Sequence, residues 1–103
     1  MKFGLPPEAV EQICGVFHTY PQIESAVIYG SRAKGNYKDG SDIDLTLTGD
    51  KLDLNLLNRI DSALDDLLLP WSFDLSIFST IKNQELINHI NRVGIIFYQR
   101  NQI

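Results

Sequence analysis

The sequence predicts an α/β protein in which a small mixed β-sheet carries helices on one face. Short apolar runs of strand length alternate along the chain with longer stretches whose apolar residues recur every three or four positions. In two of the short runs, apolar residues alternate with polar residues that include aspartates, so one face of the sheet is apolar and the other bears carboxylates. With 103 residues, 44% of them hydrophobic, we expect residues 1–103 to form a single domain.

The first expected element is a helix over about residues 7–18. Pro6-Pro7 suits a helix start, and Val10, Ile13, Cys14 and Phe17 follow at the spacing of one helix face. Cys14 is the only cysteine, so it cannot form an internal disulfide, and we expect it to be a small core residue.

A buried strand over residues 26–29 is expected next, ending at Gly30 and followed by a short helical turn that Gly35 closes. A glycine here removes the Cβ that would keep a phosphate away, and the N–H groups of the turn can bind anions. Ser31 adds a hydroxyl, and Arg32 or Lys34 could add positive charge. Gly-Ser is also a common turn dipeptide, so a purely structural role is the alternative.

The strand expected over residues 43–47 presents Asp42 and Asp44 on one face, because side chains alternate along a strand. Same-face neighbours lie roughly 6–7 Å apart, so two carboxylates can converge on metal ions about 3.5–4 Å apart, the spacing used in nucleotidyl transfer. The alternative is a pair of solvated side chains, but aspartate is depleted from strands and two of them call for an explanation.

A second helix is expected from Asp53 to Leu68, stopped by Pro70, and the strand over residues 71–78 follows it. In this strand Asp74 lies between Ser72 and Ser76 on the polar face. If the two acidic strands are neighbours, three aspartates meet on one sheet face. A solvated lone acid is the alternative for Asp74.

The last expected elements are a helix that opens at Asn83 and stops at Gly94, and a short strand over residues 95–99, which could instead extend the helix. Two histidines, His18 and His89, fall on the first and last helices. Neither has a second histidine or cysteine at ligand spacing, so we interpret both as structural.

The run GSRAKG at residues 30–35 and the run SDIDL at residues 41–45 resemble the signature of the polymerase-β-like nucleotidyltransferases, in particular their minimal nucleotidyltransferase (MNT) branch. The third carboxylate of that family falls on Asp74. The resemblance implies the polymerase-β-like fold and a site in which two Mg²⁺ ions and ATP bind. It assigns metal binding to Asp42, Asp44 and Asp74, with Asp74 a third ligand or general base, and triphosphate binding to Gly30 and Ser31, assisted by Lys34 and Ser41.

The formal charge of −4 and the pI near 4.9 argue against a nucleic-acid backbone as the partner, although bound metals would neutralise the aspartates. The N-terminal residues lack the apolar run of a signal peptide, and no stretch reaches the length of a transmembrane helix. We therefore expect a cytoplasmic protein with no membrane contact.

The function we expect is transfer of AMP from Mg-ATP to a hydroxyl group of a partner protein. The resemblance implies that this partner is a HEPN-type ribonuclease toxin modified on a tyrosine, with this chain as the antitoxin. One alternative is a binding module that caps the toxin through exposed aromatic residues, for which the candidates are Tyr20, Phe78, Phe97 and Tyr98. Another is transfer to a small molecule, which the lack of room for an acceptor-binding domain disfavours.

Overall fold

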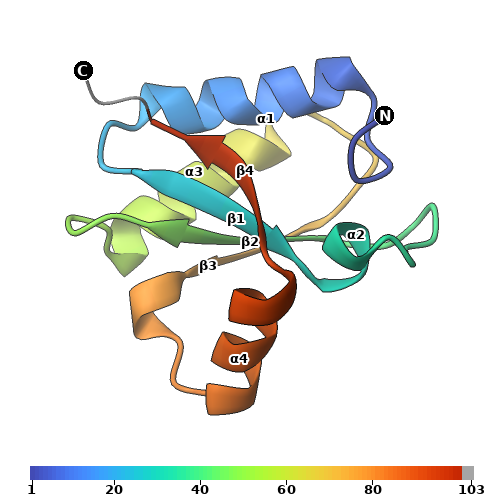
Figure 1. The fold of residues 1–103 in the computed structure, drawn as a ribbon. Helices are drawn as coiled ribbons and strands as arrows, with labels where there is room; N and C mark the ends of the chain where they lie inside the picture. The colour runs from blue at the N-terminus through green and yellow to red at the C-terminus, as the bar shows by residue number, and fades with distance from the viewer. Residues whose placement is uncertain (101–103) are drawn as a thin grey trace.

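The computed structural model of the protein describes residues 1–100 and contains one four-stranded sheet, ordered β3-β2-β1-β4 (Figure 1). The strands are β1 (Ser25–Tyr29), β2 (Ile43–Thr48), β3 (Phe73–Ile77) and β4 (Ile95–Gln99). The helices are α1 (Pro7–Thr19), α2 (Gly30–Lys34), α3 (Leu54–Asp65) and α4 (Gln84–Val93), with a 3₁₀ turn η1 (Phe78–Thr80).

The strand directions confirm the expected mixed sheet. Strand β1 runs antiparallel to both β2 and β4, whereas β2 and β3 are parallel neighbours. In the β2–β3 register Asp44 lies directly opposite Asp74, and in the β1–β2 register Tyr29 lies opposite Asp44. The topology therefore brings the two acidic strands together, as the sequence pattern requires for a three-aspartate site.

The main core lies between one face of the sheet and helices α1 and α3. Ala26, Ile28, Ile43, Leu45 and Leu47 supply the sheet side of this core. Ile13 and Phe17 reach it from α1, and Leu56, Ile60 and Leu64 reach it from α3. The period-two and helical patterns in the sequence thus meet on a common apolar layer.

Helix boundaries follow local chemistry. Pro7 is the first residue of α1, and the Asp53 side chain caps α3 by accepting the Leu56 N–H at 2.8 Å. Helix α3 ends at Asp65, three residues earlier than predicted, and Leu68 adopts a left-handed φ of 56° in the turn that follows.

None of the helices described for residues 1–100 is long and apolar enough to cross a membrane.

Helix α4 lies on the face of the sheet that bears the aspartates, which corrects the expectation that all helices share the other face. Figure 1 shows α1 and α4 on opposite sides of the sheet. The His89 ring of α4 contacts Tyr29 edge to face, with centroids 6.1 Å apart, and Gly94 packs against Val27. The aspartate face is therefore covered along β1 but stays open at Asp42 and Asp74, which are exposed.

The aromatic patch considered for a capping role does not form. Phe97 is buried in the core, and Tyr20, Phe78 and Tyr98 are partly buried. The Tyr98 ring packs on Phe17, with centroids 5.8 Å apart. Within residues 1–100, the exposed large apolar side chains are instead non-aromatic and lie in several parts of the chain: Met1, Leu54, Leu68, Ile95 and Ile96.

Candidate active site

Three aspartates gather where β2 and β3 lie side by side. Asp44 and Asp74 are register partners on parallel strands, and such strands lie about 4.8 Å apart. Asp42 precedes Asp44 by two residues, immediately before β2 begins, and so belongs to the same face. Asp42 and Asp74 are exposed and Asp44 is partly buried, so the group is open to solvent and to a ligand.

The electrostatics of Asp44 show how near these charges are. Burial raises the pKa of the Asp44 carboxyl above its usual value, and the negative charges of Asp74 and Asp42 raise it further. The positive charge of Arg32 lowers the pKa of Asp44, but by less than burial or either aspartate raises it. Burial and the two neighbouring charges therefore both oppose ionisation of Asp44, and a divalent cation bound there would relieve this opposition.

The carboxylates do not by themselves enclose a metal ion. Among residues 1–100, no three histidine, cysteine or acidic side chains form a ready cluster of metal ligands. Magnesium commonly binds proteins through one or two carboxylates, with waters and substrate phosphates completing its shell. The arrangement therefore fits an ion that arrives with a phosphate ligand better than a permanent structural metal.

Gly30 begins the turn beside the aspartates, and two features of the structure favour glycine there. Its φ of 72° lies in the left-handed region. A Cβ at this position would collide with Oδ2 of Asp44. The missing side chain predicted to admit a phosphate therefore also makes room for the Asp44 carboxylate, so the turn and the acidic strand are built against each other.

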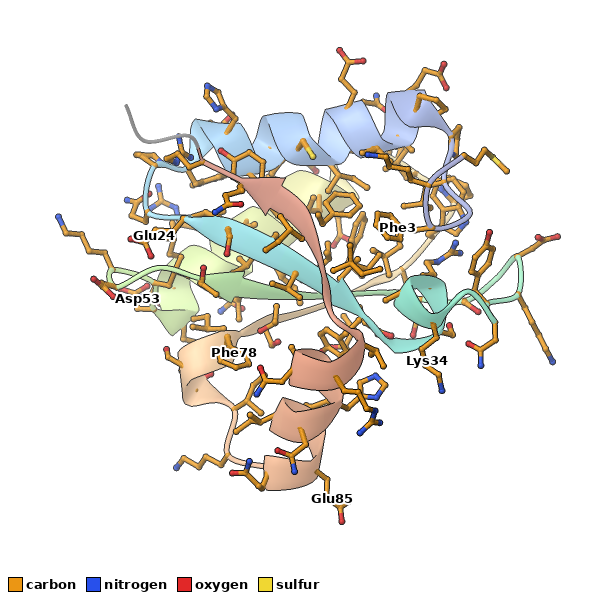
Figure 2. The ribbon with its side chains drawn as sticks, in the orientation of Figure 1. Phe3, Glu24, Lys34, Asp53, Phe78 and Glu85 are labelled. Carbon is orange, nitrogen blue, oxygen red and sulfur yellow. The ribbon has the colours of Figure 1, made fainter. Side chains whose placement is uncertain are left out.

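The rest of the turn forms the single short helix α2. Gly35 closes it with a φ of 88°, and the Gly35 N–H donates to the Ser31 carbonyl at 2.9 Å. Ser31 is partly exposed at the start of this helix, and Lys34 is exposed at its end. Figure 2 shows Lys34 projecting from α2 into solvent.

Ser41 holds the loop that leads into the acidic strand. Its hydroxyl accepts the Lys38 N–H at 2.9 Å, and its carbonyl accepts two hydrogen bonds from Arg32. These contacts fix the residue immediately before Asp42. The structure thus places Ser41 next to the site, with its side chain engaged in the loop.

Arg32 does not offer its charge to a phosphate, contrary to the sequence-based expectation, because its side chain is buried and only 2% exposed. Its Nε and Nη2 donate to the Ser41 carbonyl at 3.0 and 2.8 Å. Nη1 donates to the Phe3 carbonyl at 2.8 Å, and Nη2 also donates to the Asp39 carbonyl at 3.3 Å. The guanidinium therefore ties the loop before Asp42 to the N-terminal segment.

Replacing Arg32 by lysine should destabilise the protein by about 2 kcal/mol. A single ammonium group cannot make all the hydrogen bonds of the guanidinium, so some of the backbone carbonyls that Arg32 now binds would lose their donors. The free energy of unfolding from urea titration measures this. Arg59→Lys, at an exposed position of α3, is the matched control and should change stability by less than about 0.5 kcal/mol. Equal stabilities for the two variants would contradict the role given to Arg32.

His89 is the site neighbour that the sequence did not reveal. Its Nε2 accepts the N–H of Gly30 at 3.2 Å, although the two residues are 59 positions apart. A lone histidine on a helix carries no spacing signal, so only the packing of α4 against α2 identifies it.

A comparison with protein families covers the part of the chain that carries the Gly-Ser turn and the three aspartates. Residues 11–103 match the family model described as "Polymerase beta, Nucleotidyltransferase". The chain belongs to this nucleotidyltransferase family. A comparison with curated protein sequences gave no match.

Solved structures show the same nucleotidyltransferase fold. A crystal structure of a toxin-antitoxin with AMP-PNP contains a chain 19% identical to this one, with a TM-score of 0.72, covering 90% of this chain and 75% of the other. The toxin-antitoxin MntA-HepT has a chain 15% identical, with a TM-score of 0.68 and coverages of 92% and 74%. The structure of a tri-AMPylated Shewanella oneidensis HEPN toxin in complex with MNT antitoxin contains a chain 16% identical to this one, with a TM-score of 0.67. The match covers 90% of this chain and 71% of the other.

Proposed function

We propose that this chain is a metal-dependent nucleotidyltransferase that transfers AMP from ATP to a hydroxyl group of a partner protein. The observation that carries the proposal is the register pair Asp44–Asp74 beside the Gly30 turn. The partner is a HEPN-type toxin and the acceptor a tyrosine, so that the chain acts as an antitoxin in the cytoplasm, where ATP is available.

The residues present suit magnesium. Asp42, Asp44 and Asp74 offer only carboxylate oxygens, the ligands that this ion prefers. The pKa of Asp44 is raised first by burial and then by the negative charges of Asp74 and Asp42, which a bound cation would offset. Bound there with the triphosphate, two Mg²⁺ ions would neutralise charge on the phosphates and lower the pKa of the attacking hydroxyl.

The chain's own residues supply binding and orientation. The backbone N–H and hydroxyl of Ser31, at the open start of α2, hold triphosphate oxygens, and Lys34 adds an exposed positive charge at the other end of that turn. Asp74 is the most suitable base, because its exposed carboxylate can accept the proton of an incoming tyrosine hydroxyl while Asp44 stays fixed against Gly30.

The choice of a protein acceptor rests on the shape of the aspartate face. Helix α4 covers this face along β1 and Thr46 of β2 is also fully buried, whereas Asp42 and Asp74 remain exposed. An acceptor must therefore bring its own surface to the site. The solved relatives are described as toxin–antitoxin structures, one with AMP-PNP and one with a tri-AMPylated HEPN toxin, and they support this choice of partner.

Two alternatives make different predictions. A binding module that only caps the toxin would need no converging carboxylates, and the aromatic side chains considered for it are buried or partly buried. A transferase acting on a small molecule would label that molecule. Incubation with radiolabelled ATP and a panel of amino sugars tests this, and a labelled sugar would contradict the choice of a protein acceptor.

Intact-mass spectrometry of a HEPN-type partner protein encoded beside this chain tests the proposal. After incubation with this chain, ATP and magnesium, the partner should gain the mass of one or more AMP units, and peptide mapping should place them on tyrosine. EDTA should abolish the gain. An unchanged mass together with tight co-purification would favour the capping alternative and contradict the transferase proposal.

A further inference from the structure

His89 joins helix α4 to the turn beside the aspartates through one hydrogen bond. The Gly30 N–H donates to its Nε2 at 3.2 Å, and the ring stands edge to face on Tyr29, the last residue of β1. His89 therefore contributes to this contact as an acceptor, through the lone pair of Nε2.

The donor of this hydrogen bond, Gly30, lies where the turn meets the acidic strand. Gly30 is the first residue of α2, where backbone N–H groups have no acceptor within the helix. Its backbone also adopts a φ of 72° and lies against the Asp44 carboxylate. Glycine restricts its own backbone weakly, so a fixed orientation at this residue needs an external contact.

His89 is that external contact. It occupies the Gly30 N–H from a helix on the aspartate face, while the next N–H along the chain, that of Ser31, is the one assigned to the triphosphate under the proposed function. Rotation of the Gly30 peptide would move Ser31 and, through the close packing, the Asp44 carboxylate.

We propose that His89 is a positioning residue for nucleotide binding, which acts by holding the Gly30 peptide so that Ser31 and Asp44 face the triphosphate together. The proposal rests on the proposed function, since it assumes that this turn binds the nucleotide. It requires the acceptor nitrogen of His89 and not only the bulk of its ring.

Two substitutions separate the acceptor from the ring. His89→Phe keeps an aromatic ring against Tyr29 but removes the acceptor, whereas His89→Gln gives up the ring and keeps an amide oxygen near the position of Nε2. A residue that served only packing would favour the phenylalanine variant. A positioning residue favours the glutamine variant.

The first readout needs no nucleotide. Hydrogen exchange of the Gly30 amide, followed by NMR, should become faster in His89→Phe than in the wild type, and His89→Gln should restore protection. Unchanged exchange in His89→Phe would overturn the role of this bond. The free energy of unfolding, measured in parallel, shows whether either variant loses its fold.

The second readout is binding of AMP-PNP with magnesium by calorimetry. His89→Phe should bind about fivefold more weakly than the wild type, the effect of one lost hydrogen bond, and His89→Gln within about twofold of it. Equal binding by His89→Phe and the wild type would overturn the proposal. A wild-type protein that does not bind the nucleotide at all would overturn the proposed function, and with it the nucleotide role of His89, even if the exchange result confirmed the bond to Gly30.

Discussion

Replacing Asp44 by asparagine should lower AMP transfer by about 10²-fold or more while the fold is retained. Asp44 is the central carboxylate of the three, opposite Asp74 in the sheet and packed on Gly30, and an amide is a poor ligand for magnesium at this position. Initial rates of partner modification measure the loss, and circular dichroism checks the fold. Near-normal turnover by a folded variant would rule out the assigned site.

The same substitution should raise stability at pH 7 in the absence of metal. The pKa of Asp44 is raised in the folded protein, so the folded state binds this proton more tightly than the unfolded state does. The free energy of unfolding therefore falls as pH rises from the unfolded pKa, about 3.9, through the folded pKa. Asparagine carries no charge and avoids this loss.

Thermal melts with EDTA at pH 7 and pH 3 measure the effect. The Asp44→Asn variant should melt above the wild type at pH 7, and the difference should shrink at pH 3, where the aspartate is protonated in both states. Asp50→Asn, at an exposed turn, is the control and should follow the wild type. A less stable Asp44→Asn variant at pH 7 would mean that Asp44 makes contacts that outweigh the repulsion.

Replacing Gly30 by alanine should reduce AMP transfer by about 10²-fold, because the new Cβ would displace the Asp44 carboxylate and small misplacements of catalytic groups carry losses of this size. The left-handed φ of 72° should also lower the free energy of unfolding by about 1–2 kcal/mol. Transfer rates and urea titrations measure the two effects separately.

Gly35→Ala is the matched control for this prediction. Its φ of 88° imposes the same kind of backbone strain, but a Cβ at Gly35 meets no atom within 4 Å. It should therefore lower stability by a similar 1–2 kcal/mol or so while transfer stays within about threefold of the wild type. Equal loss of transfer in both variants would show that backbone strain, and not the contact with Asp44, disables the enzyme.

The acidic site could be predicted because strand geometry alone determines much of it. Alternation along a strand places Asp42 and Asp44 on one face, and the same alternation gives Asp74 the corresponding face of its own strand. The sequence did not show that β2 pairs with β3, so this pairing was an assumption, and the structure confirms it. The roles of these residues in catalysis stay predictions.

The contacts that support the site could not be predicted, because they depend on how separate elements pack. Arg32 resembles a phosphate ligand by its place in the turn, yet its guanidinium is buried among backbone carbonyls. His89 lies on a helix whose apolar spacing is compatible with either face of the sheet, and only its packing brings the imidazole to Gly30. Periodicity identifies the face of a helix that is buried but not the surface that buries it.

The position of a radiolabel in ATP tests the central claim most directly, that this site transfers a nucleotidyl group with the help of metal. With the partner protein and magnesium, label from α-³²P ATP should stay on the partner, and label from γ-³²P ATP should leave as pyrophosphate. EDTA and Asp44→Asn should each prevent both outcomes. Label from γ-³²P ATP on the partner would indicate phosphoryl transfer instead, and no label from either donor in a stable complex would indicate capping without catalysis.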